Sequence, residues 1–358
     1  MAKRLRSGFT TGSCSAAAAK AATVALIEGV CPTEIEIPFP DGSRKSFAVS
    51  TCRIDDKVAT AAIIKDAGDD PDVTNRAEIL ATVSLQQEIA GDSDCVTIES
   101  VQLCRGKGVG LATKPGLAVK VGEPAINPIP RKMIVRAIQE VTQEPLKATI
   151  SVTNGEVLAD KTLNHRLGIV GGLSILGTTG IVRPVSADAW TATISASMDV
   201  AREAGINDIV LSTGRTSEKG AQHLLDLPIE AFAMMGDYLE FSLKEAAKKG
   251  FSTIHIAGMW AKIMKAALRI PQTHVRNGAL EVQDGAKLLA SLGATGDLLE
   301  KLQLSNTARE MLTHIEDAGK VELIRAVCKR ARDYAQDTSK LQVKVYLIDH
   351  KAEIVAHV

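Results

Sequence analysis

Helical and strand-like patterns alternate from Ser186 onward, and this alternation constrains the fold more than any other feature of the chain. The expected helices cover residues 188–204, 218–225, 238–249 and 262–268, and the expected strands cover 208–211, 230–235 and 253–257. Strands that alternate with helices pair in parallel, because each crossover helix returns the chain to the same end of the sheet. We therefore expect an α/β Rossmann-like domain with a parallel sheet over residues 186–358, closed by terminal strands in 341–358.

Residues 1–185 show a different pattern, in which an alanine-rich helical run is followed by short strand-like segments. These segments cover residues 34–38, 46–51, 59–65, 78–85 and 95–103, and several of them alternate apolar with polar residues. Alternation with a period of two indicates strands with one buried face, which are commonly antiparallel. Because 358 residues exceed what one core usually supports, we expect a separate α+β N-terminal domain before the α/β domain.

Composition restricts the class of protein. The 42 basic and 42 acidic residues give a formal net charge of zero, so we expect neither nucleic acid nor a membrane as a partner. The six cysteines form no CxxC pair, and the acidic run from Asp66 to Asp72 matches no calcium loop. These features predict a cytoplasmic protein with reduced thiols and no metal site. A homo-oligomer is compatible with the composition, and the sequence leaves the oligomeric state open.

A turn rich in threonine and glycine precedes the alanine-rich run and recurs later in the chain. Its first copy is formed by Thr10, Thr11, Gly12 and Ser13, its second includes Thr178, Thr179 and Gly180, and a variant covers residues 211–217. Such a turn at a helix start offers unpaired N–H groups that can bind an anion. A single capped helix is more often scaffold, but the recurrence favours a ligand with many oxygens.

A second ligand-binding region is expected in the C-terminal half. Ligands of parallel α/β sheets bind beyond the carboxyl ends of the strands, which here carry residues 212–217, 236–238 and 258–260. Asp237 follows the second strand, where an acidic side chain commonly binds a ribose diol; capping the next helix is its alternative role. Since the full GxGxxG spacing is absent, we expect an adenosine ligand without phosphates, such as S-adenosylmethionine.

Six segments of the chain carry a resemblance to a known family, and they cover residues 9–14, 65–74, 113–117, 122–128, 173–184 and 212–218. In family order, from residue 5 to about residue 340, they resemble the CbiD family, the cobalt-precorrin-5B C1-methyltransferases of anaerobic cobalamin biosynthesis. One segment departs from the family pattern: Gln272 and Val275 flank Thr273 and His274 where Asn-Thr-His-Ser is expected.

The resemblance implies that the cofactor S-adenosylmethionine methylates C1 of cobalt-precorrin-5B, a cobalt-corrinoid, to give cobalt-precorrin-6A. The carboxylates of the corrinoid are expected to contact Thr10, Thr11, Gly12, Ser13, Lys114, Asn127, Arg131, Thr178, Thr179, Gly180 and Arg183. A plain surface charge is the alternative role of each basic side chain. Cofactor contacts are expected from Thr213, Gly214, Arg215, Thr216, Ser217, Asp237, Tyr238, Gly258 and Met259. If a proton must leave the ring, His274 is the candidate catalytic base.

Two other functions compete with this one: a nucleotide-dependent corrinoid oxidoreductase and a non-catalytic corrinoid carrier. The missing GxGxxG spacing disfavours the oxidoreductase. A carrier would bind the corrinoid without changing its mass, which separates it from a methyltransferase.

Overall fold

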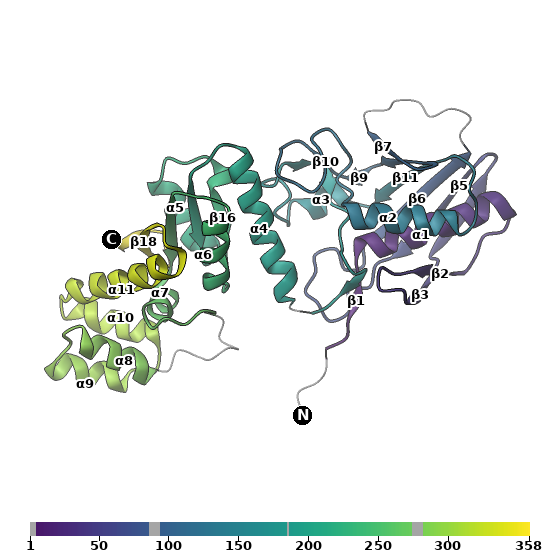
Figure 1. The fold of residues 1–358 in the computed structure, drawn as a ribbon. Helices are drawn as coiled ribbons and strands as arrows, with labels where there is room; N and C mark the ends of the chain where they lie inside the picture. Colours follow the sequence, from purple (N-terminus) through teal and green to yellow (C-terminus); the bar gives the residue numbers. More distant parts are fainter. Residues whose placement is uncertain (1–4, 86–93, 185, 274–281) are drawn as a thin grey trace. The chain divides into compact units, whose positions relative to one another are not determined.

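The computed structural model describes residues 5–85, 94–184, 186–273 and 282–358. The chain divides into two compact units, unit 1 (Met1–Ala187) and unit 2 (Asp188–Val358), whose elements are labelled in Figure 1. Unit 1 contains a six-stranded mixed sheet and unit 2 a parallel sheet with one antiparallel edge strand, so the fold is mixed α and β. Among the described residues, no helix combines the length and the apolar character that crossing a membrane requires.

The large sheet of unit 1 has the strand order β4-β5-β6-β11-β8-β7. Its strands are β4 (Thr51–Asp55), β5 (Val58–Ile64), β6 (Glu78–Leu85), β11 (Leu146–Val152), β8 (Val101–Arg105) and β7 (Cys95–Ile98). Neighbours are antiparallel except β11 and β8, which run parallel. Alternate residues of β11 are buried, as a strand with one face on a core requires.

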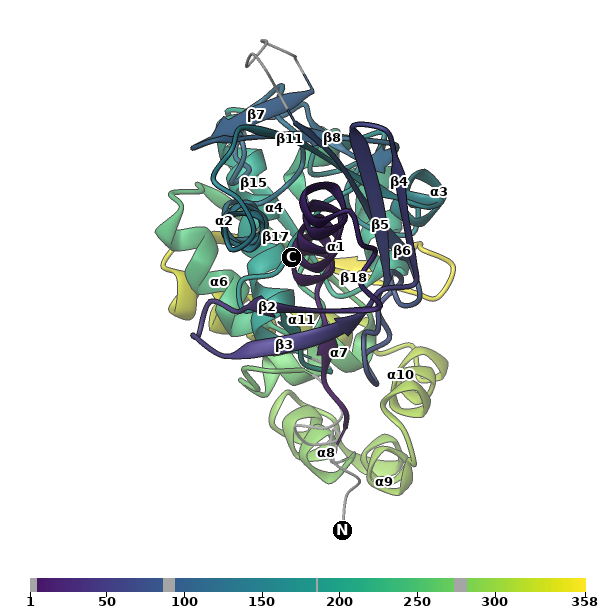
Figure 2. The same ribbon diagram turned by 90° about the vertical axis from the view of Figure 1, so that its right-hand side faces the viewer.

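Helix α1 (Thr11–Glu28) packs against β5 and β6 on one side and against α2 (Pro128–Gln139) on another (Figure 2). It begins after the N-cap Thr10 and ends at Gly29, whose φ of 70° favours glycine. Its alanines at positions 16–19, 21, 22 and 25 have no exposed surface. Because a methyl group lets neighbouring backbones approach closely, the alanine-rich run forms a helix that is enclosed by protein.

Short strands tie the loops of unit 1 together. They are β1 (Gly8–Phe9) paired with β14 (Ile181–Val182), β9 (Gly108–Val109) with β13 (Gly172–Leu173), β10 (Leu111–Ala112) with β12 (Ile169–Val170), and the hairpin of β2 (Glu34–Pro38) and β3 (Arg44–Ala48). A short helix, α3 (Gly155–Ala159), follows β11. The pairing of β1 with β14 brings the start of the unit to its end.

Two disulfides in unit 1 correct the expectation of six reduced thiols. Cys31 pairs with Cys52, and Cys95 pairs with Cys104. The second pair lies directly opposite on the antiparallel strands β7 and β8. Spacing along the chain does not reveal such pairs, because strand pairing brings the thiols together. The remaining cysteines, Cys14 and Cys328, are buried and free.

The sheet of unit 2 has the order β16-β15-β17-β18-β19. Its strands are β15 (Asp208–Ser212), β16 (Phe232–Met234), β17 (Thr253–Gly258), β18 (Gln342–Ile348) and β19 (Ile354–His357). The first four strands in this order are parallel, and β19 is antiparallel to β18. The parallel sheet predicted from the alternating pattern is therefore confirmed, and its strand order reverses between β15 and β17.

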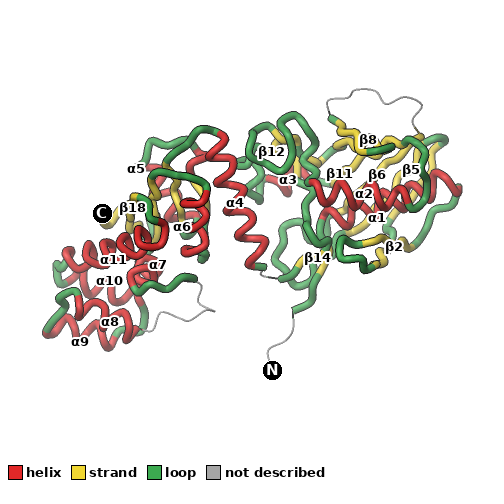
Figure 3. The backbone as a smooth tube through the Cα atoms, viewed as in Figure 1, coloured by secondary structure: helices red, strands yellow, loops and turns green. Residues whose placement is uncertain are grey.

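The helices of unit 2 cover both faces of this sheet. They are α4 (Ala187–Glu203), α5 (Arg215–Leu224), α6 (Leu239–Lys248), α7 (Trp260–Ala267), α8 (Val282–Ser291), α9 (Gly296–Leu304), α10 (Ala308–Asp317) and α11 (Val321–Ser339), with a 3-10 turn at Ile229–Ala231. Helices α8 to α11, which follow β17 and precede β18 in the sequence, pack together as a helical group (Figure 3). The expected elements did not include α8 to α11.

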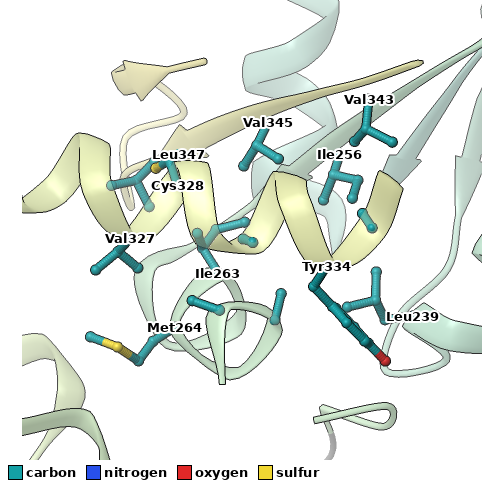
Figure 4. Packing of buried hydrophobic residues seen from close by; sticks show 14 of the residues in the cluster. Leu239, Ile256, Ile263, Met264, Val327, Cys328, Tyr334, Val343, Val345 and Leu347 are labelled. Carbon is teal, nitrogen blue, oxygen red and sulfur yellow. The ribbon is translucent and has the colours of Figure 1, made fainter. Parts of the chain in front are cut away.

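The main core of unit 2 lies between the sheet and helices α7 and α11 (Figure 4). Val327 and Tyr334 of α11 share this core with Ile256 of β17 and Val345 of β18. Successive residues of the same strands, such as Ala257, belong to a smaller core under α5. Burial on both faces explains why the sheet contains uninterrupted apolar runs, such as residues 209–211 of β15.

Candidate functional site

A pocket of about 370 Å³ opens at the carboxyl ends of β15, β17 and β18 in unit 2. The described residues that line it are Thr213, Gly214, Arg215, Thr216 and Ser217 after β15, Met259, Trp260, Ala261 and Lys262 after β17, Arg309 and Leu312 on α10, and Ile348, Asp349 and His350 after β18. The strand order reverses between β15 and β17, so the loops that follow these strands lead to helices on opposite faces of the sheet. A crevice forms at such a reversal.

The loop between β15 and α5 is held by hydroxyl groups. Ser217 Oγ accepts a hydrogen bond from Gly214 N at 3.1 Å and donates one to Gly214 O at 2.9 Å, so it caps the helix start. Thr213 N donates to Ala257 O at 3.0 Å, which fastens the loop to β17. Below the loop, Ser212 Oγ donates to the buried carboxylate of Glu218 at 3.2 Å. The predicted cofactor residues 213–217 therefore form an ordered rim of the pocket.

Gly258 ends β17 and lets the two loops meet. A Cβ atom at this position would lie 2.9 Å from Ile263 Cδ1 and 3.3 Å from Thr213 Cγ2. The next residue, Met259, is the N-cap of α7 and lines the pocket. Of these two predicted cofactor residues, Met259 reaches the pocket and Gly258 supports its wall.

Asp237 lies at the centre of a polar cluster and is not among the described residues that line the pocket. Its carboxylate forms an ion pair with the Lys262 ammonium and accepts a hydrogen bond from Thr273 Oγ1 at 3.0 Å. Lys262 Nζ and Lys265 Nζ both donate to Thr273 O, at 2.9 and 3.0 Å. Tyr238, not Asp237, is the N-cap of α6. The structure thus joins Asp237 to protein groups, and its ribose contact stays a prediction.

The buried Lys265 of this cluster differs from its neighbour on α7. Burial, together with the adjacent Lys262 ammonium, lowers the pKa of Lys265, while Asp237 opposes the shift. Lys265 is 3% exposed, whereas the Lys262 side chain is 27% exposed and lines the pocket. Two lysines that share one carbonyl acceptor therefore face different surroundings.

The charges around the pocket are predominantly positive. Arg215, Lys262 and Arg309 line it, with Asp349 as the acidic lining residue within the described part of the chain. Hydrogen bonds from two backbone N–H groups of the turn after β18, each 2.8 Å long, lower the pKa of Asp349. Asp349 is therefore ionised near neutral pH and has a fixed orientation.

In unit 1, the structure brings two of the predicted corrinoid-binding turns together. Thr10 N donates to Gly180 O at 3.0 Å, and Ser13 Oγ donates to the same oxygen at 2.8 Å. Leu176 N donates to Thr11 Oγ1 at 2.9 Å. Thr10, Thr11 and Ser13 are all buried. Their polar groups therefore join the two turns to each other.

Gly12 packs closely against two other segments of unit 1. Its N–H donates to Leu176 O at 3.0 Å, and a Cβ atom would lie 2.8 Å from Pro130 Cγ. Gly180 has a φ of +81°, and a Cβ there would lie 2.5 Å from the ring of Phe39. Both glycines are required by packing between the turns and their neighbours.

Other predicted corrinoid contacts are more accessible. Thr178, Thr179 and Arg183 are exposed, and Lys114 and Asn127 are half-buried. Asn127 is the N-cap of α2. His274, the candidate base, lies outside the described residues.

Arg131 is held by the segment before α2. Its guanidinium donates to Ile126 O at 2.6 Å and to Pro124 O at 3.2 Å, and it pairs with Glu123 at 2.8 Å. Its side chain is 12% exposed. These bonds fix the chain that leads into α2.

The acidic run of unit 1 forms an ion pair with a buried lysine. Lys65 is 1% exposed, and its Nζ lies 2.7 Å from Asp72 Oδ2. Burial alone would raise the pKa of Asp72, but the Lys65 ammonium and hydrogen bonds from Thr74 outweigh burial and lower it. Burial raises the pKa of the nearby Cys14 thiol to about 12, so Cys14 is not a thiolate at neutral pH.

Sequence reasoning missed several residues of the pocket. Trp260 lies within the expected segment 258–260, whereas Lys262 follows the predicted strand 253–257 closely and could have been included on that ground. Arg309 belongs to α10, and Asp349 and His350 follow a strand late in the chain. No local motif marks these three, because only the assembled sheet brings them to the carboxyl end of β15.

Comparison with known proteins gives consistent matches along the chain. The family model CbiD matches residues 1–184, and the model described as CbiD, C-terminal domain, matches residues 272–358. A cobalt-precorrin-5B C(1)-methyltransferase from Desulfotalea psychrophila is 61% identical over 355 residues, covering 98% of this chain and 97% of the relative. One from Geobacter metallireducens is 46% identical over 370 residues, covering 99% and 98%. The crystal structure of a cobalamin biosynthesis protein (cbiD) from Archaeoglobus fulgidus is 28% identical, with a TM-score of 0.39 over 72% of this chain and 78% of that one.

Proposed function

The chain belongs to the CbiD family, and on that premise we propose that it is a methyltransferase that transfers a methyl group from S-adenosylmethionine to C1 of cobalt-precorrin-5B. The product is cobalt-precorrin-6A, an intermediate of anaerobic cobalamin biosynthesis. The observation that carries the proposal is the 61% identity to a relative of this name over 98% of the chain. Identity of this extent covers both units, so it includes the regions that would bind each reactant.

We assign the cofactor to the pocket of unit 2, which would then work as a Rossmann-like domain. The volume of about 370 Å³ falls in the range of small-molecule sites. When bound, S-adenosylmethionine supplies an electrophilic methyl group on a sulfonium. Thr213, Gly214, Arg215, Thr216, Ser217 and Met259 line the pocket and would contact it, while Gly258 would support the wall. Tyr238, the N-cap of α6, is not among the described residues that line the pocket.

Within this pocket we propose Asp349 as the partner of the ribose diol. Its carboxylate lines the pocket, and backbone N–H groups orient it. A carboxylate can accept strong hydrogen bonds from both hydroxyls of a diol. Asp237, predicted for this role, is already bonded to Lys262 and Thr273.

We assign the corrinoid to loops of unit 1. The exposed Thr178, Thr179 and Arg183, with Lys114 and Asn127, offer hydroxyl, amide and cationic donors to its carboxylates. Thr10, Thr11, Gly12, Ser13 and Gly180 would act by fixing the shape of these loops, and Arg131 by holding the chain before α2. His274 stays the proposed acceptor if a proton must leave the ring.

The proposed chemistry needs alignment more than a protein nucleophile. Holding two reactants in line can remove about 7 to 11 kcal/mol from a barrier. Direct transfer to a nucleophilic ring carbon forms no covalent bond to the enzyme. The buried Cys14, with its raised pKa, is suited to packing and not to attack.

The test is anaerobic incubation of the purified protein with cobalt-precorrin-5B and S-adenosylmethionine carrying a carbon-labelled methyl group. Mass spectrometry should show the gain of one labelled methyl, and magnetic resonance should place the label on C1. Bound corrinoid of unchanged mass would identify a carrier instead. A mass change by hydrogen alone would identify an oxidoreductase.

A further inference from the structure

Lys262 is held with its ammonium beside the pocket of unit 2. Asp237 and the carbonyl of Thr273 accept two of its three N–H donors. The third has no partner among the described residues. The side chain is 27% exposed and lines the pocket, so a ligand can reach it.

The surroundings of Lys262 favour an anionic group. Arg215 and Arg309 line the same pocket, are exposed, and form no ion pair with another residue in the described ranges. Met259 and Trp260 place the start of α7 there as well, and a helix start carries partial positive charge. The whole chain has no net charge, so this concentration of cations is a local feature.

We propose that Lys262 binds a carboxylate of the ligand in this pocket and that Asp237 is the positioning residue that holds its ammonium. The inference rests on the proposed function, because both reactants carry carboxylates: S-adenosylmethionine on its amino-acid end and the corrinoid on its side chains. A charge-assisted bond from an oriented ammonium recognises either. The experiment distinguishes the two sources.

The first measurement compares two ligands of the full-length protein by calorimetry. S-Adenosylhomocysteine carries the amino-acid carboxylate, and methylthioadenosine shares its nucleoside and thioether but lacks the carboxylate. We expect Lys262→Met to weaken S-adenosylhomocysteine about tenfold or more and to leave methylthioadenosine within about twofold. If Lys262→Met does not fold, Lys262→Gln removes the charge while keeping a polar side chain.

Lys265→Met is the matched control. Lys265 lies on the same helix and donates to the same carbonyl of Thr273, but it is not among the described residues that line the pocket. Its loss should lower the melting temperature and leave the ratio of the two affinities unchanged. Asp237→Asn should reduce the ratio part of the way, and Asp237→Glu should restore it, since a purely structural role would change both affinities together.

The second measurement is the half-saturating concentration of cobalt-precorrin-5B at saturating S-adenosylmethionine. If Lys262→Met leaves the ratio of the two affinities intact but raises this concentration about tenfold, Lys262 binds a corrinoid carboxylate, and the proposal holds with that source. A folded Lys262→Met protein unchanged in both measurements overturns it. If the parent protein binds neither adenosyl ligand, the proposed cofactor pocket fails, and the corrinoid measurement alone decides the role of Lys262.

Discussion

The turn before α1 in unit 1 and the turn before α5 in unit 2 have similar sequences but different surroundings. Both place threonine, glycine and serine at a helix start. In unit 1 the N–H of Gly12 is bonded to Leu176, and α1 is enclosed by the sheet and α2. In unit 2 the turn lies at the end of a parallel strand and lines a pocket. The comparison teaches that a similar turn can join parts of the protein at one helix start and line a pocket at another, depending on what packs around it.

The largest expected effect separates a structural lysine, Lys65, from the lysine that we propose binds a ligand, Lys262. Lys65→Met would remove an ammonium that is 1% exposed and leave the Asp72 carboxylate with its hydrogen bonds from Thr74, which should lower the free energy of unfolding by about 2 to 3 kcal/mol. Lys262→Met breaks a pair that is about one-quarter exposed on each side, so it should cost about 1 kcal/mol or less. Denaturant unfolding followed by circular dichroism measures both. Equal losses would remove the distinction between the two units.

The next prediction concerns the glycines of the two turns. Gly12→Ala places a methyl group 2.8 Å from Pro130 and should destabilise the protein by about 1 to 3 kcal/mol. At Gly214 the backbone is extended, with a φ of 174°, and a Cβ meets nothing within 4 Å. Gly214→Ala should therefore change stability by less than about 0.5 kcal/mol. Tolerance of Gly12→Ala would mean that the turns of unit 1 are looser than the structure shows.

The third prediction tests which acidic residue of unit 2, Asp349 or Asp237, binds the ribose. Asp349→Asn should weaken S-adenosylhomocysteine and methylthioadenosine alike, by about tenfold, because both contain the ribose. Asp237→Asn should weaken only the ligand with a carboxylate. Calorimetric titration of the two variants with both ligands is the measurement. The opposite pattern would return the ribose to Asp237 and make Asp349 a turn residue.

The smallest expected effect is a difference in pH dependence. Burial, with a contribution from Lys344, lowers the pKa of His255 below its usual 6.5, although Asp208 opposes the shift. The unfolded chain then binds the proton more readily, so this stabilisation is complete above pH 6.5 and is lost as the pH falls below that value. Asp72 of unit 1 has a lowered pKa, so its contribution is lost only below about pH 3.8.

Tryptophan fluorescence can follow unit 2 alone, because Trp190 and Trp260 are the two tryptophans of the chain. The denaturant concentration at the unfolding midpoint of unit 2 should decrease as the pH is lowered from about 7.5 to about 5. The substitution His255→Gln should reduce this pH dependence. Unfolding of unit 1 should depend less on pH over the same range. It is followed by the part of the circular dichroism change that does not coincide with the fluorescence change. A slope that persists in His255→Gln would assign the titration to another group.

Local patterns predicted the elements of the sheets better than the contacts of the site. The alternation after Ser186 predicted the parallel strands, since strand and helix periods are visible in a single segment. The alanine run likewise predicted α1. The burial of Thr10 and the approach of Arg309 depend on segments far apart in the chain, and the disulfides depend on strand register. Such information is absent from any one window of sequence.

The enclosure of α1 also has a consequence for the order in which the chain acquires structure. Most of the stability of a helix within a protein comes from packing. The partners that pack on α1 and bond to its first turn include β6, α2 and Gly180, and the Ser13 contact to Gly180 spans 167 residues. During synthesis, α1 leaves the ribosome before β6, α2 and Gly180, so it must wait for nearly all of unit 1 before its contacts are complete. Until then its alanine surface is exposed, and the segment around residue 180 completes its enclosure.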